Sequence, residues 1–328
     1  MAEPKPASDL TRRVLAGDRV ALARAISLIE NETPQAAEVE DVCFRKSGRA
    51  LRLGITGPPG AGKSTLVMRI AQEYRRRGET VAIVAVDPTS PFTGGALLGD
   101  RVRMAELAGD DGVFIRSMAT RGSMGGLAVH TAQACDVLDA AGFARVVVET
   151  VGVGQSELEV AQTADSTAVV LVPESGDGVQ AMKAGLMEIG DLFVINKSDR
   201  DGADRAAFSI RSALELRAPG SAWSPPVLQT VATEGRGVAE VVEAFEEHLE
   251  HMRVHGGFER RRRRRFEQRL DDLLRAHLWQ EFRAQVPAAE WAAALDRLES
   301  RRATPNGTAA VLIERFGANR PGAARSSG

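Results

Sequence analysis

Seven short runs of β-branched and apolar residues follow one another between residues 50 and 232. A stretch with helical periodicity or a glycine-rich loop separates each run from the next. In order, the runs are LRLGIT, TVAIVAV, GVFIRS, RVVVET, TAVVLV, LFVIN and PVLQTVA. Strands that are apolar on both faces and alternate with helices are typical of a parallel sheet covered on both sides. The pattern therefore predicts an α/β fold with a doubly wound, mostly parallel sheet over residues 50–254.

Helical periodicity flanks this predicted sheet on both sides. Residues 8–46 repeat apolar positions at helical spacing, which predicts two or three helices, with Asp18 and Thr33 as N-caps. After residue 257 the spacing is helical again, and we expect these helices to bury their apolar stripe by dimerisation. The expected parts are a helical extension at 1–49, the sheet domain at 50–254, a helical arm at 255–317 and a disordered tail at 318–328.

A glycine-rich segment with the pattern GxxxxGKS/T joins the first predicted strand to a helix, which is the context that a nucleotide-binding phosphate loop requires. The glycines let backbone N–H groups turn onto phosphate oxygens, and the helix N-terminus adds a favourable dipole. We expect Lys63 to reach the β- and γ-phosphates and the Ser64 hydroxyl to bind Mg²⁺. The predicted nucleotide-binding residues here are Gly57, Pro58, Gly60, Ala61, Gly62, Lys63, Ser64 and Thr65.

The pattern NKxD stands at the end of the strand run LFVI, as Asn196-Lys197-Ser198-Asp199. The Asp199 carboxylate can accept two hydrogen bonds from guanine, whereas adenine would leave it unpaired. We expect Asn196 to tether neighbouring loops and the Lys197 stem to lie over the base. The loop expected to close over the base contains Val231, Ala232 and Thr233. Together with the phosphate loop, this pattern predicts a GTP-binding site.

Two carboxylates, Asp87 and Glu149, stand at the ends of predicted strands. Mg²⁺ prefers oxygen ligands, so carboxylates from adjacent strand ends suit it. The segment that begins at Glu149 resembles the DxxG switch of GTPases, in which the Gly152 N–H would contact the γ-phosphate. Asp100 follows in a long loop rich in glycine and hydroxyl residues. From its position it suits a metal or catalytic-water role and, equally well, an N-cap of the next helix.

Composition and charge narrow the class of protein. The chain has 328 residues, of which 44% are hydrophobic and 26% are charged, and its formal net charge is −2. This near-neutral balance gives no reason to expect a nucleic acid or a membrane surface as partner. Two widely separated cysteines, Cys43 and Cys135, indicate a reducing compartment. Because no signal peptide or membrane-spanning apolar run is evident, we expect a cytoplasmic protein.

Six consecutive arginines, Arg260 to Arg265, stand near the start of the predicted arm. They cover about one and a half helical turns, so their side chains point all round a helix. A solvated face with intrahelical ion pairs and a contact with a partner protein fit this run equally well. Nucleic-acid binding fits it poorly, because acidic residues flank the run and no aromatic residues interleave it.

Four segments of the chain resemble the MeaB/ArgK family, the methylmalonyl-CoA mutase-associated GTPases. They are GPPGAGKST, VDPTSPFTGGALLGDRVRM, ETVGVGQSE and PESGDGVQAMKAGLMEIGDLFVINKSD. The resemblance implies a homodimeric P-loop GTPase that binds an adenosylcobalamin-dependent acyl-CoA mutase. It implies further that the protein gates cofactor loading from the cobalamin adenosyltransferase and protects or reactivates the mutase. By the same resemblance, the magnesium and catalytic-water shell would consist of Ser64, Asp87, Asp100 and Glu149.

The resemblance also implies a third switch at residues 175–187, which would signal between nucleotide and mutase. Within it, Gln180 and Lys183 are the residues that we expect to act in stimulated hydrolysis. Phosphoryl transfer spreads negative charge over the γ-phosphate oxygens, so a cation delivered by a partner-induced rearrangement would make hydrolysis depend on the mutase. Apart from the resemblance, the sequence favours an ordinary solvated lysine at Lys183.

Two other functions share part of these motifs. A metallochaperone GTPase would favour a His-rich tract or a CxxC pair, whereas this chain has five scattered histidines. A small-molecule kinase could use the same phosphate loop, but NKxD selects guanine and no lid is evident. The sequence leaves open which mutase would be served, with methylmalonyl-, ethylmalonyl-, isobutyryl- and 2-hydroxyisobutyryl-CoA mutases as the alternatives.

Overall fold

The computed structural model describes residues 8–87, 107, 109–119, 126–150, 156–173, 185–217 and 222–318. Contacts along the chain divide it into two compact units, Met1–Phe266 and Glu267–Gly328. The boundary falls inside one helix, α12 (Gly257–Gln285). Among the described residues, no helix combines the length and the apolar character needed to span a bilayer.

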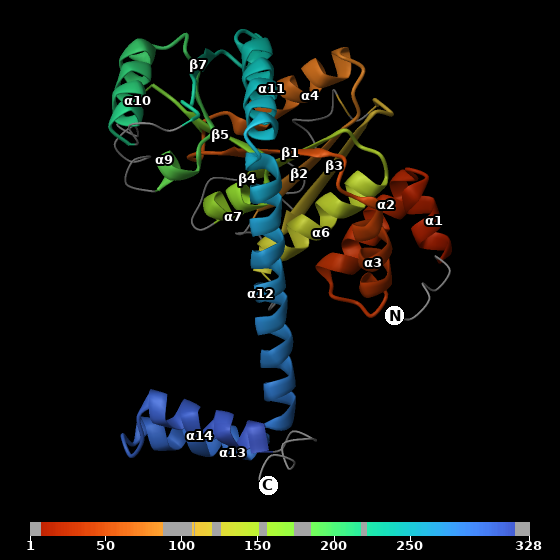
Figure 1. The fold of residues 1–328 in the computed structure, drawn as a ribbon, viewed down its shortest axis with the longest axis vertical. Helices are drawn as coiled ribbons and strands as arrows, with labels where there is room; N and C mark the ends of the chain where they lie inside the picture. Colours follow the sequence, from red (N-terminus) through yellow and green to blue (C-terminus); the bar gives the residue numbers. More distant parts are fainter. Residues whose placement is uncertain are drawn as a thin grey trace. The chain divides into compact units, whose positions relative to one another are not determined.

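The first unit is built on a seven-stranded sheet with the order β3-β2-β4-β1-β5-β6-β7 (Figure 1). Every strand pairing in it is parallel. The strands are β1 (Leu51–Thr56), β2 (Val81–Asp87), β3 (Val113–Ala119), β4 (Arg145–Thr150), β5 (Ser166–Leu171), β6 (Leu192–Asn196) and β7 (Val227–Thr230). Each lies within or overlaps one of the seven apolar runs, so the predicted doubly wound α/β fold is confirmed. Because all strands are parallel, their carboxyl ends meet at one edge of the sheet.

Helices cover both faces of this sheet, as Figure 1 shows. Alternate residues of a strand enter different cores: Val81 and Ile83 of β2 pack on one face, and Ala82 and Val84 on the other. The first face is covered by α4 (Lys63–Arg76) and α11 (Val238–Val254). The opposite face is covered by α6 (Gly126–Ala140), α7 (Ser156–Thr163), α9 (Leu186–Ile189) and α10 (Ala203–Arg217).

Three helices precede the sheet, as the periodicity predicts: α1 (Asp9–Leu15), α2 (Arg19–Glu30) and α3 (Ala36–Lys46). They share a core with α6 and with strands β2, β3 and β4, so they belong to the first unit. Asp18 caps α2 by accepting the Ala21 N–H at 2.9 Å. The prediction for Thr33 is wrong, because α3 begins after Gln35. The Thr33 hydroxyl instead donates to the Leu28 carbonyl at 3.3 Å, which closes the turn that follows α2.

The arginine run of α12 turns partly inward, against the amino ends of β5 and β6. Arg261 forms a two-pronged ion pair with Asp191, at 2.7 and 2.8 Å. Arg265 lies 2.9 Å from Asp165, and Arg262 donates to two backbone carbonyls just before β1, at 2.6 and 3.0 Å. We call Arg261, Arg262 and Arg265 the arginine clamp. It binds the chain's own sheet, whereas the sequence predicted a solvated face or a contact with a partner protein.

The second unit contains the remainder of α12 together with α13 (Ala288–Glu299) and α14 (Pro305–Ala318). The helical prediction for this part of the chain is confirmed. A small core holds the unit together, formed by Phe282, Ala294 and Leu312 with Val286, Trp291 and Phe316 around them. Leu270, Leu274 and Leu278 recur every fourth residue of α12 and remain 60, 52 and 47% exposed. The predicted tail, apart from Ala318, lies outside the described residues.

Candidate nucleotide-binding site

The phosphate loop joins β1 to α4 at the carboxyl edge of the sheet. Gly57 has φ +135°, and a Cβ there would lie 2.0 Å from the Val170 carbonyl oxygen. Gly62 has φ +84°, and a Cβ there would lie 2.4 Å from the Asn196 amide nitrogen. Residues with a side chain rarely adopt such φ values, and neither position has space for one. The loop can therefore lie this close to β5 and β6 only because these positions are glycine.

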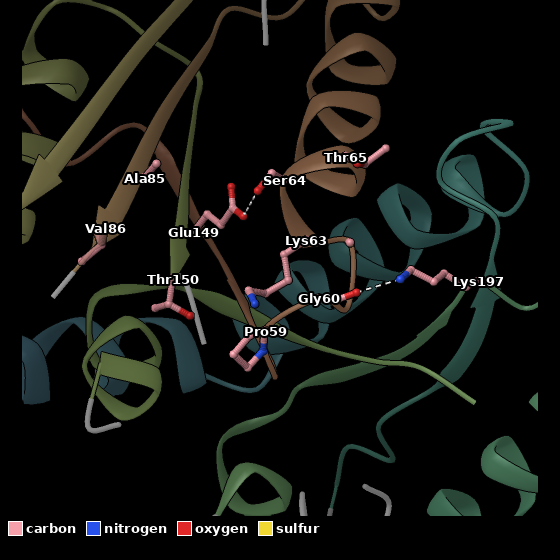
Figure 2. Close-up of a pocket in the computed structure, with 11 residues that line it drawn as sticks. Pro59, Gly60, Lys63, Ser64, Thr65, Ala85, Val86, Glu149, Thr150 and Lys197 are labelled. Carbon is pink, nitrogen blue, oxygen red and sulfur yellow. Dashed lines mark hydrogen bonds between the residues drawn. The ribbon is translucent and has the colours of Figure 1, made fainter. Parts of the chain in front are cut away.

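Lys63 begins α4 and is buried. Its Nζ donates to the carbonyls of Gly57 and Pro58, at 2.8 and 2.9 Å, so the ammonium lies within the curve of the loop. The N-terminus of α4 adds the positive end of a helix dipole to this charge. A cavity of about 430 Å³ opens beside it, of a size that takes a small ligand. Figure 2 shows its lining, which is Pro59, Gly60, Gly62, Lys63, Ser64, Thr65, Ala85, Val86, Glu149, Thr150 and Lys197.

Ser64 and Glu149 come together at the wall of this cavity. The strand register places Glu149 of β4 beside Ile55 of β1 and Ala85 of β2. The Ser64 hydroxyl donates to Glu149 Oε1 at 2.6 Å (Figure 2), and the Glu149 side chain is buried. Both groups offer hard oxygen atoms at the phosphate end of the cavity, which fits Mg²⁺.

Asn196 joins three segments at the tip of β6. Its side-chain amide donates to the Ala61 carbonyl of the phosphate loop at 2.8 Å. Its oxygen accepts the Thr230 hydroxyl and the Ala232 N–H, both at 3.1 Å. All of these partners are buried. The phosphate loop and the loop after β7 are therefore held by one side chain, and the tether expected from the sequence corresponds to these contacts.

The rest of the predicted base site lies around Asn196. Lys197 has φ +58°, and its Nζ donates to the Gly60 carbonyl at 2.8 Å, so its stem passes beside the phosphate loop (Figure 2). Asp199 is exposed in the turn between β6 and α10. Val231 and Ala232 are buried directly after β7, whereas Thr233 is exposed.

Four of the predicted residues lie outside the described part of the chain. They are Asp100, Gly152, Gln180 and Lys183. The backbone of Asp87 is described, at the end of β2 and next to Ala119 of β3. The roles of these residues stay predictions.

One contact near the site involves a residue that the sequence analysis did not single out. Arg69 of α4 donates to the carbonyls of Ala232 and Thr233, at 3.2 and 3.1 Å. These partners lie 163 and 164 residues further along the chain, so no local pattern marks the contact.

A phosphate loop between β1 and α4, with NKxD at the tip of β6, defines this chain as a P-loop GTPase. Comparison with known proteins gives the family. Residues 22–287 match the model for "Methylmalonyl Co-A mutase-associated GTPase MeaB", and the chain belongs to this family. The predicted resemblance is thereby confirmed.

Individual relatives support the same assignment. The chain is 45% identical to a putative GTPase of Pyrococcus abyssi, over 93% of this chain and 95% of the relative. It is 33% identical to the mouse protein "Methylmalonic aciduria type A homolog, mitochondrial", over 90% of this chain and 76% of the relative. Among solved structures, it resembles an LAO/AO transport system kinase with a TM-score of 0.73 and 30% identity, covering 96% of this chain and 99% of that one.

Proposed function

We propose that this GTPase is a chaperone of an adenosylcobalamin-dependent acyl-CoA mutase, methylmalonyl-CoA mutase or a close relative. It would gate loading of the cofactor, with the cobalamin adenosyltransferase in the loading complex, and protect or reactivate the mutase. The observation that carries this proposal is the family match over residues 22–287, since the family's description contains the mutase. The relative named for methylmalonic aciduria agrees with it.

In this proposal the predicted site residues divide the tasks of GTP hydrolysis, which gives GDP and phosphate. The phosphate-loop amides and Lys63 would hold the phosphates, and Asp199 would select guanine. Ser64 and Glu149, with Asp87 and Asp100, would hold Mg²⁺, which when bound neutralises charge on the phosphates. Gly152 would sense the γ-phosphate, and Gln180 and Lys183 would act when the mutase stimulates hydrolysis.

We propose that the protein works as a homodimer in the cytoplasm. The recurring exposed leucines of α12 support a contact between copies, because an apolar stripe of this kind is normally covered. The two cysteines, Cys43 and Cys135, are unpaired and buried, which suits a reducing compartment.

The test is phosphate release from GTP, measured for the purified protein alone and with each candidate mutase. We expect one mutase to stimulate release. Lys183→Ala should abolish this stimulation while GDP affinity stays unchanged, and Lys46→Ala, an exposed lysine on α3, is the matched control. The Asp199→Asn variant should lose GTP binding, and with it the preference for GTP over ATP. Failure of every mutase to bind or to stimulate would reject the chaperone role but leave the GTPase assignment in place.

A further inference from the structure

Arg69 lies on α4 within two turns of Lys63, and each of its three guanidinium nitrogens donates a hydrogen bond. Nε donates to the Ala232 carbonyl at 3.2 Å, and one terminal nitrogen donates to the Thr233 carbonyl at 3.1 Å. The other terminal nitrogen donates to Gln72 Oε1 at 2.9 Å, one turn further along the helix. A planar fork fixed at three points positions its partners more tightly than a lysine ammonium could.

The loop that Arg69 contacts is a tight turn, in which the Glu234 N–H donates to the Val231 carbonyl at 2.9 Å and the Gly235 N–H to the Ala232 carbonyl at 3.3 Å. It leaves β7 at Thr230, and an isolated bridge between Val231 and Arg236 closes it. Asn196 holds the loop by accepting the Ala232 N–H, on the side that faces β6. Arg69 holds the same residue by its carbonyl, from the side of α4. The backbone of Ala232 is therefore fixed at both of its polar groups.

We propose that Arg69 is a positioning residue for guanine recognition, an inference that rests on the proposed binding of guanine nucleotides by this site. Helix α4 receives the phosphates at its first turn, through Lys63 and Ser64. Through Arg69 the same rigid helix sets the position of residues 231–233, which close over the base. Arg69 does not contact the nucleotide in this scheme, and it acts only through the loop.

The experiment compares ligands that use different parts of the site. GDP uses the phosphate loop and the base loop, whereas inorganic pyrophosphate uses the phosphate loop alone. In Arg69→Met, which keeps an unbranched apolar stem, we expect GDP affinity to fall about tenfold, equivalent to about 1.4 kcal/mol. Pyrophosphate affinity should stay at the wild-type value. Calorimetry gives both constants, and stopped-flow release of a fluorescent GDP analogue should show faster dissociation.

Two further variants separate positioning from folding. Arg76→Met removes an exposed arginine of the same helix, paired with Glu73, and should change neither constant. Arg69→Lys keeps the charge but not the fork, so its GDP affinity should lie between the wild type and Arg69→Met. This graded response distinguishes loop positioning from a general loss of stability.

Three outcomes would overturn the proposal. They are an unchanged GDP affinity in Arg69→Met, an equal fall for GDP and pyrophosphate, and a full loss of GDP binding in Arg69→Lys. A wild-type protein that binds ADP as tightly as GDP would refute guanine recognition itself, and the role of Arg69 with it. The comparison with ADP therefore tells the two failures apart.

Discussion

Replacing Asp165 with asparagine measures how much the arginine clamp stabilises the first unit. The Asp165 side chain is fully buried. Its Oδ1 lies 2.9 Å from Arg265 and 3.5 Å from Arg262, and its Oδ2 accepts the Arg52 N–H at 2.9 Å. Burial alone would raise the pKa of Asp165, but attraction to Arg265 and Arg262 and the backbone hydrogen bond outweigh burial and lower this pKa. The charge of the carboxylate therefore favours the folded state.

The loss of folding stability in Asp165→Asn depends on how many hydrogen bonds the clamp arginines retain. Asparagine has nearly the same volume and retains one acceptor oxygen, so the substitution removes the charge with little change in packing. Removing one partner of a buried ion pair costs about 3–5 kcal/mol. Arg265 would keep the Thr163 carbonyl, and Arg262 its two carbonyls before β1. We therefore expect the lower limit, about 3 kcal/mol, which for a unit of this size lowers Tm by roughly 6–12 °C.

Thermal and urea unfolding followed by circular dichroism measure this change. Asp41→Asn is the matched control, because the Asp41–Arg45 pair is even shorter, at 2.7 Å, but 59 and 60% exposed. An exposed pair contributes less than about 1 kcal/mol. A second variant, Arg265→Met, allows a double-mutant cycle, and the double variant should lose less than the sum of the single losses.

The reasoning would be refuted by an Asp165→Asn protein as stable as the Asp41→Asn control. Strict additivity in the cycle would refute it as well, because then the two charges do not interact. GDP affinity should stay at the wild-type value in Asp165→Asn, since Asp165 lies at the amino edge of the sheet and the phosphate loop at the carboxyl edge.

Three other changes probe the same structure. Gly57→Ala should weaken GDP binding by more than about tenfold in calorimetry, because a Cβ has no space there, whereas Gly78→Ala, with open space, should leave it unchanged. Burial lowers the pKa of His248 from 6.5 to about 4, so its contribution to stability is complete above pH 6.5 and lost as pH falls towards 4. The urea-unfolding difference between wild type and His248→Gln should accordingly shrink by about 2 kcal/mol between pH 7.5 and 5, and a constant difference would contradict a buried neutral ring. Burial raises the pKa of Cys43 to about 12 and of Cys135 to about 11, so at pH 8 the two thiols should react with a disulfide reagent about 1,000-fold and about 100-fold more slowly than in urea. Fast labelling of the folded protein would show that these side chains are accessible.

Much of the fold could be predicted because its signals are local. A strand buried on both faces is a continuous apolar run, and all seven runs became strands of the sheet. The phosphate loop and NKxD are short motifs whose spacing is visible in the sequence, although Asn196 then contacts Ala61 across 135 residues. Thr33 shows the limit of such signals, since a hydroxyl before a helix can cap it or bond backwards, and the choice depends on the preceding turn.

The remaining features depend on residues far apart in the chain. Arg261 binds Asp191 across 70 residues and the Asp165 carbonyl across 96. In the sequence, six arginines beside acidic residues resemble a solvated helical face. Only the folded sheet brings the starts of β5 and β6 against them. Arg69 is hidden in the same way, because its distant partners are backbone carbonyls, which leave no trace in side-chain patterns. A sequence pattern can therefore locate a motif more easily than the residues that support it.

The parallel sheet explains why stability and nucleotide binding can be tested separately in this protein. Strands β5 and β6 each begin beside a carboxylate held by the clamp, Asp165 and Asp191. The same strands end at the nucleotide site, where β5 contacts Gly57 and β6 supplies Asn196. Because both strands are buried along their length, changes at one edge should alter stability without altering contacts at the other. A loss of GDP affinity in Asp165→Asn at temperatures well below its Tm would show instead that the two edges are coupled through β5.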